Sequence, residues 1–110
     1  QRIAFLLRPS TGPAATARSL VAQLQAGTID PALLTPNGKA WFTAARLADF
    51  KASLAPLGPL RMLEGQGVQV RGGMTWHGFD AAFGRRTLSV SMRLMPDGRV
   101  EQFLVGPKVG

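Results

Sequence analysis

A single histidine, His77, is the one side chain of this sequence whose ordinary pKa lies near neutral pH. In proteins such a residue can act as a general base or as a hydrogen-bonding group in a pocket. Acid–base catalysis normally needs a second oriented group, and the sequence shows none for His77. We therefore favour a histidine at the margin of the core, hydrogen-bonded to a backbone carbonyl or to Gln102, over a catalytic residue.

The remaining residue types exclude several other kinds of site. Without Cys there is no disulfide, thiol nucleophile or Cys-based metal site, and one His cannot supply the ligands that zinc needs. Gly65-Gln66-Gly67 fails the dinucleotide-binding pattern, because Val70 stands at its sixth position, and the two glycines instead predict a bulge in a strand. No serine lies in a Gly-x-Ser-x-Gly motif. We expect no metal, no cofactor and no catalytic residue.

The charge of the chain suits an anionic partner, but its distribution does not suit a specific one. Thirteen Lys and Arg against six Asp and Glu give a formal net charge of +7. The cations are spread singly, and the one adjacent pair is Arg85-Arg86, whereas nucleic-acid modules cluster them on one face. We therefore expect no specific nucleic-acid partner, and keep weak, salt-sensitive binding of anionic polymers as an alternative.

Length and composition predict one globular domain over residues 1–110, which begins with an extended lead-in at 1–13. The chain is 45% hydrophobic and 17% charged, as is typical of a folded domain. Its longest apolar run, Ile3 to Leu7, is far shorter than the roughly 20 residues of a membrane span. Arg2 precedes only this five-residue apolar run and no small-residue cleavage site follows it, so we expect neither a membrane span nor a complete signal peptide.

Two helices are predicted in the first third of the chain. From Ala14 the apolar residues recur at helical spacing, and Gly27 is placed to end the helix. Asp30 as N-cap and Pro31 at the first helical position then predict a short second helix that runs through Leu34.

A third helix follows a turn. Thr35-Pro36-Asn37-Gly38 predicts the turn, and Thr43 is placed to cap the next helix. Phe50 and Leu54 lie on the apolar side of that helix, and Pro56-Leu57-Gly58-Pro59 ends it. After this point the hydrophobic period changes from 3.6 to 2, which predicts four antiparallel strands in a meander at about 60–71, 74–83, 86–95 and 99–105.

Two tight turns predict the register of the last three strands. A two-residue loop at Gly84-Arg85 pairs His77 with Met92, and a three-residue loop at Pro96-Asp97-Gly98 pairs Met92 with Gln102. One face then collects Phe79, Ala81, Phe83, Leu88, Val90, Leu94, Val100 and Leu104. Because this apolar face must receive the helices, the predicted fold class is α+β, with three N-terminal helices packed on a curved, cone-like meander.

His77 and Gln102 are the polar residues of that inner face, and they flank Met92 in the predicted register. Buried polar groups need a partner, a water or a ligand, so we expect a pocket here. The candidate ligand-binding residues are His77, Met92, Gln102, Phe79 and Val90, with Phe42 and Phe50 as further apolar walls.

The opposite face of the sheet has no helix left to cover it. The predicted register places four candidate interface residues there, namely Trp76, Arg93, Phe103 and Val105. Trp76 could form a cation–π contact with Arg93, and Arg93 an ion pair with Glu101. An exposed apolar face of this kind favours a contact surface for a second copy or for a partner domain.

Turn and core motifs accompany this order of elements, namely Ala17-x-x-Leu20-x-x-x-Leu24-x-x-Gly27, Leu34-Thr35-Pro36, Leu57-Gly58 and Pro96-Asp97-Gly98. Over nearly its whole length the chain resembles the nuclear transport factor 2-like (cystatin-like) superfamily of cone-shaped domains. The pattern is similar to small exported bacterial domains of unknown function, some of them fused to serine hydrolases. The resemblance implies a periplasmic or secreted domain and a hydrolase domain or second copy as partner.

Members of that superfamily with known chemistry, such as ketosteroid isomerase and scytalone dehydratase, work inside the cone with Asp, Tyr or His. This sequence has no Tyr, and its six carboxylates fall on helices, turns or the outer face of the predicted sheet. No catalytic residue is therefore carried over. The predicted function is a non-catalytic domain that binds a small apolar ligand or serves as an accessory or dimerisation module. The alternative is a small isomerase- or dehydratase-like enzyme that uses His77.

Overall fold

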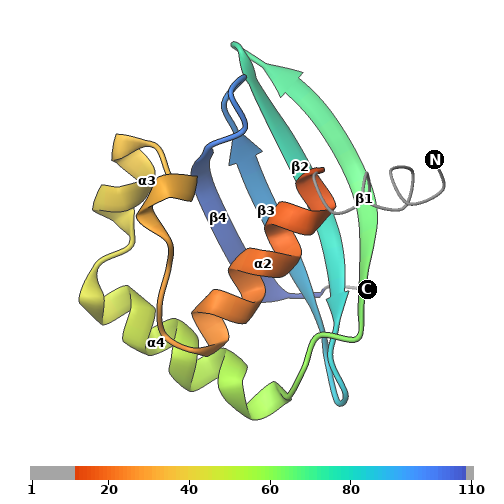
Figure 1. Ribbon diagram of the computed structural model, residues 1–110. Helices are drawn as coiled ribbons and strands as arrows, with labels where there is room; N and C mark the ends of the chain where they lie inside the picture. Colours follow the sequence, from red (N-terminus) through yellow and green to blue (C-terminus); the bar gives the residue numbers. More distant parts are fainter. Residues whose placement is uncertain (1–11, 109–110) are drawn as a thin grey trace, which may run out of the picture.

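Three α-helices lie on one face of a four-stranded antiparallel sheet in the computed structural model, which describes residues 12–108 (Figure 1). The elements are α2 (Pro13–Gln25), α3 (Pro36–Trp41), α4 (Ala44–Leu54), β1 (Met62–Arg71), β2 (Met74–Ala82), β3 (Thr87–Leu94) and β4 (Val100–Pro107), with short 3-10 helices at Pro31–Leu33 and Ala55–Leu57. This arrangement confirms the α+β class and the four-stranded meander. Most of the expected lead-in at 1–13 lies outside the described residues, and Pro13 already belongs to α2.

Helix α2 packs one apolar stripe against the sheet. The stripe consists of Ala17, Leu20, Val21 and Leu24, all of them buried. Gly27 follows the helix with a φ of 80°, a conformation that favours glycine, and its N–H donates to the carbonyl of Leu24 at 3.0 Å. The first predicted helix is therefore confirmed, together with the glycine that ends it.

The turn expected at residues 35–38 is wrong, because α3 begins there. The hydroxyl oxygen of Thr35 accepts a hydrogen bond from the Gly38 N–H at 3.0 Å, and Pro36 occupies the start of the helix. Thr-Pro suits a helix start as well as a turn, and packing selects the helix here. Gly38 is buried against β4, where an added Cβ would come within 2.6 Å of the Val100 carbonyl oxygen. The second predicted helix is one 3-10 turn, Pro31–Leu33, capped by Asp30.

The third predicted helix is confirmed as α4. The Thr43 hydroxyl oxygen accepts from the Arg46 N–H at 3.2 Å, which is the predicted N-cap. Leu54 is buried, and Leu47 and Phe50 pack against the core. The apolar side of α4 therefore faces the rest of the domain, as its spacing predicts.

The register of β2 and β3 follows the sequence prediction. The Phe83 N–H donates to the Arg86 carbonyl at 2.7 Å across the two-residue loop, and His77 pairs with Met92. In β1 the pairing shifts between Gly65 and Gly67, which confirms the bulge expected from these glycines.

The pairing of β3 with β4 differs from the prediction after its first residue pair. The turn itself is as expected, since the Met95 N–H donates to the Arg99 carbonyl at 2.9 Å and Leu94 pairs with Val100. The register then shifts by one, so that Arg93 pairs with Gln102. Glu101 is the extra residue of this β-bulge, and every later residue of β4 therefore points to the face opposite to the predicted one.

Contacts with the start of α3 explain the bulge. The Glu101 carboxylate accepts hydrogen bonds from the Thr35 hydroxyl at 2.7 Å and from the Asn37 amide at 2.9 Å. The Thr35 N–H also donates to the Val100 carbonyl at 3.0 Å. These bonds direct Glu101 sideways toward α3, and the strand resumes its alternation one residue later. The predicted ion pair between Arg93 and Glu101 is therefore wrong.

The bulge exchanges the residues of the two faces of β4. Met92 pairs with Phe103, which is fully buried, and Val105 also lies on the helix side of the sheet. The prediction that Phe103 and Val105 belong to the open face is wrong, and so is the prediction that Gln102 faces inward beside Met92. Leu104 takes their place on the outer face and is 42% exposed.

Replacing two neighbouring residues of β4 tests this register. Phe103→Ala should lower the free energy of unfolding by about 3–5 kcal/mol, because it removes a fully buried aromatic ring. Leu104→Ala is the control and should cost less than about 1 kcal/mol, because that side chain is partly in solvent. Urea unfolding of both variants measures the difference. A larger loss for Leu104→Ala would contradict the bulge.

Glu101 makes the stability of the domain depend on pH. The hydrogen bonds from Asn37 and Thr35 lower the pKa of this carboxyl, so its stabilising effect is present at neutral pH and is lost as the pH falls through the lowered pKa. Glu101→Gln should therefore unfold at lower urea concentration than the wild type at about pH 7, and the difference should shrink below about pH 4.3. Glu64→Gln on the exposed face of β1 is the matched control. A difference that stays constant with pH would refute this role.

Candidate functional site

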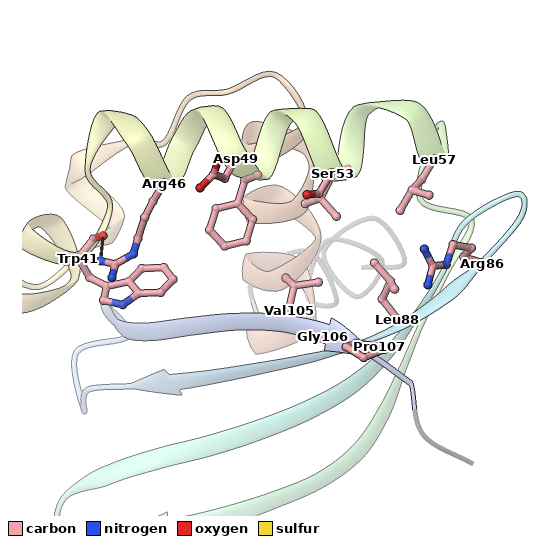
Figure 2. Close-up of a pocket in the computed structure, with 12 residues that line it drawn as sticks. Trp41, Arg46, Asp49, Ser53, Leu57, Arg86, Leu88, Val105, Gly106 and Pro107 are labelled. Atoms are coloured by element: carbon pink, nitrogen blue, oxygen red, sulfur yellow. Dashed lines mark hydrogen bonds between the residues drawn. The ribbon is translucent and has the colours of Figure 1, made fainter.

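An open groove lies between α4 and the paired ends of β3 and β4 (Figure 2). Its volume is about 490 Å³, within the range of small-molecule sites. It is lined by Trp41, Arg46, Asp49, Phe50, Ser53, Leu54, Leu57, Arg86, Leu88, Val105, Gly106 and Pro107. Apolar walls with a few polar groups are typical of ligand pockets, so we take this groove as the candidate site.

An aromatic cluster forms one wall of the groove. The rings of Trp41 and Phe42 meet edge to face, with their centroids 4.9 Å apart, and those of Phe42 and Phe50 lie 5.9 Å apart. Phe42 is buried in the core, whereas Trp41 and Phe50 are partly exposed. The cluster therefore fixes two aromatic side chains of the groove against the body of the domain.

Arg46 is held at one end of the groove by two contacts with Trp41. Its Nη1 donates a hydrogen bond to the Trp41 carbonyl at 2.8 Å, and its Cζ lies 4.5 Å from the Trp41 ring centroid (Figure 2). The Thr43 cap fixes the turn of backbone between these two residues. Because a guanidinium has five N–H donors, Arg46 keeps donors for a ligand after this bond is made.

Three further polar residues complete the site. Asp49 and Ser53 come from α4, and Arg86 stands at the far end of the groove, just before β3 (Figure 2). Within residues 12–108, none of the three side chains makes a hydrogen bond or ion pair with another residue. The groove therefore has a guanidinium at each end and a carboxylate and a hydroxyl along its rim, all available to a ligand.

The floor of the groove depends on the bulge in β4. Leu88 and Val105 lie on the inner face of the sheet, and Pro107 closes the end of β4. In the predicted register Val105 would have faced outward, so the floor exists in this form because Glu101 shifts the strand by one residue. Only Phe50, among the residues that line the groove, had been expected to line a pocket.

The residues predicted to bind a ligand lie elsewhere. Phe79, Val90 and Met92 are buried in the core, and Gln102 is on the outer face opposite Arg93. His77 is on the inner face and half-buried, and neither the groove nor the smaller pocket described below contains it. The role of these five residues in ligand binding stays a prediction.

His77 has an environment that disfavours its charged form. Its ring stacks on that of Phe79, with 6.4 Å between the centroids and 15° between the planes. Among the described residues no hydrogen bond reaches the imidazole, and desolvation by burial lowers its pKa. The structure therefore favours the neutral imidazole, but within the described residues it supplies no second group to orient it for catalysis.

A smaller pocket lies on the outer face of the sheet. It contains two of the four residues predicted for that face, Trp76 and Arg93, together with Gln69, Arg71 and Met74. Its volume is about 280 Å³. The sheet separates it from the groove, so the two sites are independent.

Trp41, Arg46 and Arg86 line the groove but were not predicted as site residues from the sequence. The first two were detectable in part, because a Thr43 cap places an arginine in the first turn of a helix directly after an aromatic pair. No local signal placed Arg86 opposite α4, since that depends on how far the helix reaches along the sheet.

Neither a metal site, a membrane-spanning helix nor a similar protein points to a function for this chain. In the described part of the chain, no group of three His, Asp or Glu residues is placed to hold a metal ion, and no helix is long and apolar enough to cross a bilayer. No family model, curated protein or solved structure matches the chain. The function must therefore be argued from the geometry of the two pockets.

The titration of His77 can be measured directly, because it is the sole histidine of the sequence. Its imidazole protons should titrate in the NMR spectrum with a midpoint below 6.5. By linkage, the folded state should lose stability as the pH falls through 6.5, a loss that His77→Asn should abolish. A midpoint at or above 6.5 would contradict the desolvated environment.

Proposed function

We propose that this chain is a non-catalytic binding domain that takes a small, mostly apolar ligand into the groove between α4 and the sheet. The observation that carries the proposal is the groove of about 490 Å³, with aromatic and aliphatic walls and polar groups confined to its ends and rim. A cavity of this size and lining suits a small molecule better than a polymer.

The arrangement of the groove suggests how such a ligand would lie. Its apolar body would pack between the aromatic wall of Trp41 and Phe50 and the floor of Leu88 and Val105. A hydrogen-bond acceptor at its end would meet a guanidinium, and Arg46 is already oriented by its contacts with Trp41. Little side-chain entropy would then be lost on binding at that end.

The absence of an oriented acid–base pair supports a binding role over an enzymatic one. His77 lies outside the groove, and among the described residues no hydrogen bond connects Ser53 to Asp49. The alternative of an isomerase- or dehydratase-like enzyme that uses His77 has one favourable observation, the neutral imidazole on the inner face. Neither of the two pockets described contains His77, so this alternative has no cavity next to the imidazole ring.

We further propose that the domain belongs with the nuclear transport factor 2-like superfamily and works as an exported module beside a second copy or a hydrolase domain. Support comes from the order of three helices and a four-stranded meander. Trp76 and Arg93 remain on the outer face for such a contact, joined there by Leu104.

Filling the groove tests the binding proposal. The neutral fluorophore N-phenyl-1-naphthylamine should bind the wild-type protein at one saturable site, with increased emission. Ser53→Trp places an indole in the groove from an exposed position on α4 and should weaken this binding by at least about tenfold, since a tenfold loss corresponds to only about 1.4 kcal/mol.

The matched control is Ala48→Trp, which adds the same indole to an exposed position on the other side of α4. This variant should bind the fluorophore as the wild type does. Circular dichroism should show both variants folded. Equal binding by Ser53→Trp and the wild type would place the fluorophore elsewhere and refute the groove as the ligand site.

A further inference from the structure

The pocket on the outer face of the sheet is built from three strands. Gln69 and Arg71 come from β1, Met74 and Trp76 from β2, and Arg93 from β3. The cross-strand pairs Gln69–Trp76, Arg71–Met74 and Trp76–Arg93 place all five side chains on the same face. This site does not depend on the proposed ligand groove, which lies on the other side of the sheet, although it shares Trp76 and Arg93 with the proposed contact surface.

Two glycines leave room for the indole of Trp76 to lie close to the sheet. Gly67 and Gly78 are cross-strand partners in the row next to Trp76. A Cβ added to Gly78 would come within 2.6 Å of Cη2 of the indole, and one added to Gly67 within 3.6 Å of its Cζ3. The six-membered ring therefore rests on backbone that no side chain covers, which fixes the aromatic wall of the pocket.

The two arginines of the pocket have no acidic partner in the described part of the chain. The ion pairs found there are Arg99 with Asp97 and Lys108 with Asp80, and no carboxylate lines the pocket. Arg71 and Arg93 lie on the two strands that flank β2, about 10 Å apart, and their partners Met74 and Trp76 are two residues apart along β2. Two long side chains can reach one anion across this diagonal. The pocket is therefore cationic at its edges and apolar in its middle.

We propose that this pocket binds a small organic anion. The phosphate or carboxylate of the ligand is received between Arg71 and Arg93, whose planar guanidinium groups donate paired hydrogen bonds to such groups. The apolar part of the ligand packs against Trp76 and Met74, and the Gln69 amide supplies one further donor or acceptor. The volume of about 280 Å³ limits the ligand to a small molecule.

A nucleic-acid strand fits the pocket less well. Sequence-independent binding of a strand uses several stacked aromatic residues along a continuous basic path. This pocket offers one indole and two guanidinium groups, and the other cations of the chain are dispersed.

Trp76 itself reports on binding. In a Trp41→Phe background it is the sole tryptophan of the sequence, and its fluorescence should change saturably on addition of phenyl phosphate. Arg71→Ala with Arg93→Ala should weaken the binding of phenyl phosphate by at least about tenfold, because two charge-assisted contacts are lost. Arg85→Ala in the β2–β3 loop is the matched control, which removes one exposed cation outside the pocket and should leave binding unchanged.

Further probes distinguish the possible anions. Inorganic phosphate should bind more weakly than phenyl phosphate, since it makes no contact with Trp76 and Met74. Benzoate binding that depends equally on Arg71 and Arg93 would support a carboxylate ligand, and a preference for phenyl phosphate would support a phosphate ligand. An absence of binding by both aromatic probes overturns the proposal, as does an equal loss in Arg85→Ala. The proposal is also overturned if an oligothymidylate binds more tightly than phenyl phosphate and Arg85→Ala weakens that binding as much as the double variant does. General surface charge would then explain the binding.

Discussion

The carboxylate of Glu101 connects the helical layer to the sheet, and the two faces of β4 are arranged around this contact. It accepts hydrogen bonds from Thr35 and Asn37 at the start of α3, next to the backbone bond from Thr35 to Val100. A strand that followed a strict alternation would direct Glu101 to the outer face. The contact with α3 instead inserts one extra residue into β4 and reverses the orientation of everything after it.

The groove follows from that one-residue shift, whereas the pocket on the outer face is lined by residues of β1, β2 and β3. On the inner face it buries Phe103 in the core and places Val105 in the floor of the groove. On the outer face it replaces Phe103 and Val105 by Leu104 and leaves Gln102, in place of Glu101, next to Arg93. The groove thereby becomes more apolar, and Arg93 in the outer pocket has no carboxylate beside it on β4.

Each of the two sites contains two arginines. Arg46 and Arg86 mark the ends of the groove, and Arg71 and Arg93 mark the edges of the outer pocket. In each place one guanidinium lies beside an aromatic residue, Arg46 over Trp41 and Arg93 across from Trp76, so charge and apolar surface act on the same ligand. A uniform basic surface would not create such sites, whereas pairs placed by neighbouring strands and one helix do.

Local sequence signals determined most of the architecture, because caps, turn residues and hydrophobic periodicity act within a few residues of the chain. They predicted α2 with Gly27, the Thr43 cap, the Gly84-Arg85 hairpin and the bulge at Gly65 and Gly67. The register of β4 and the groove were decided only by the tertiary structure, whereas the face that carries Trp76 and Arg93 was predicted from the sequence. The bulge arises from hydrogen bonds between residues 64 and 66 positions apart, and no periodicity within β4 encodes them. Because side chains alternate along a strand, that distant contact determined which residues of β4 face a ligand and which face solvent.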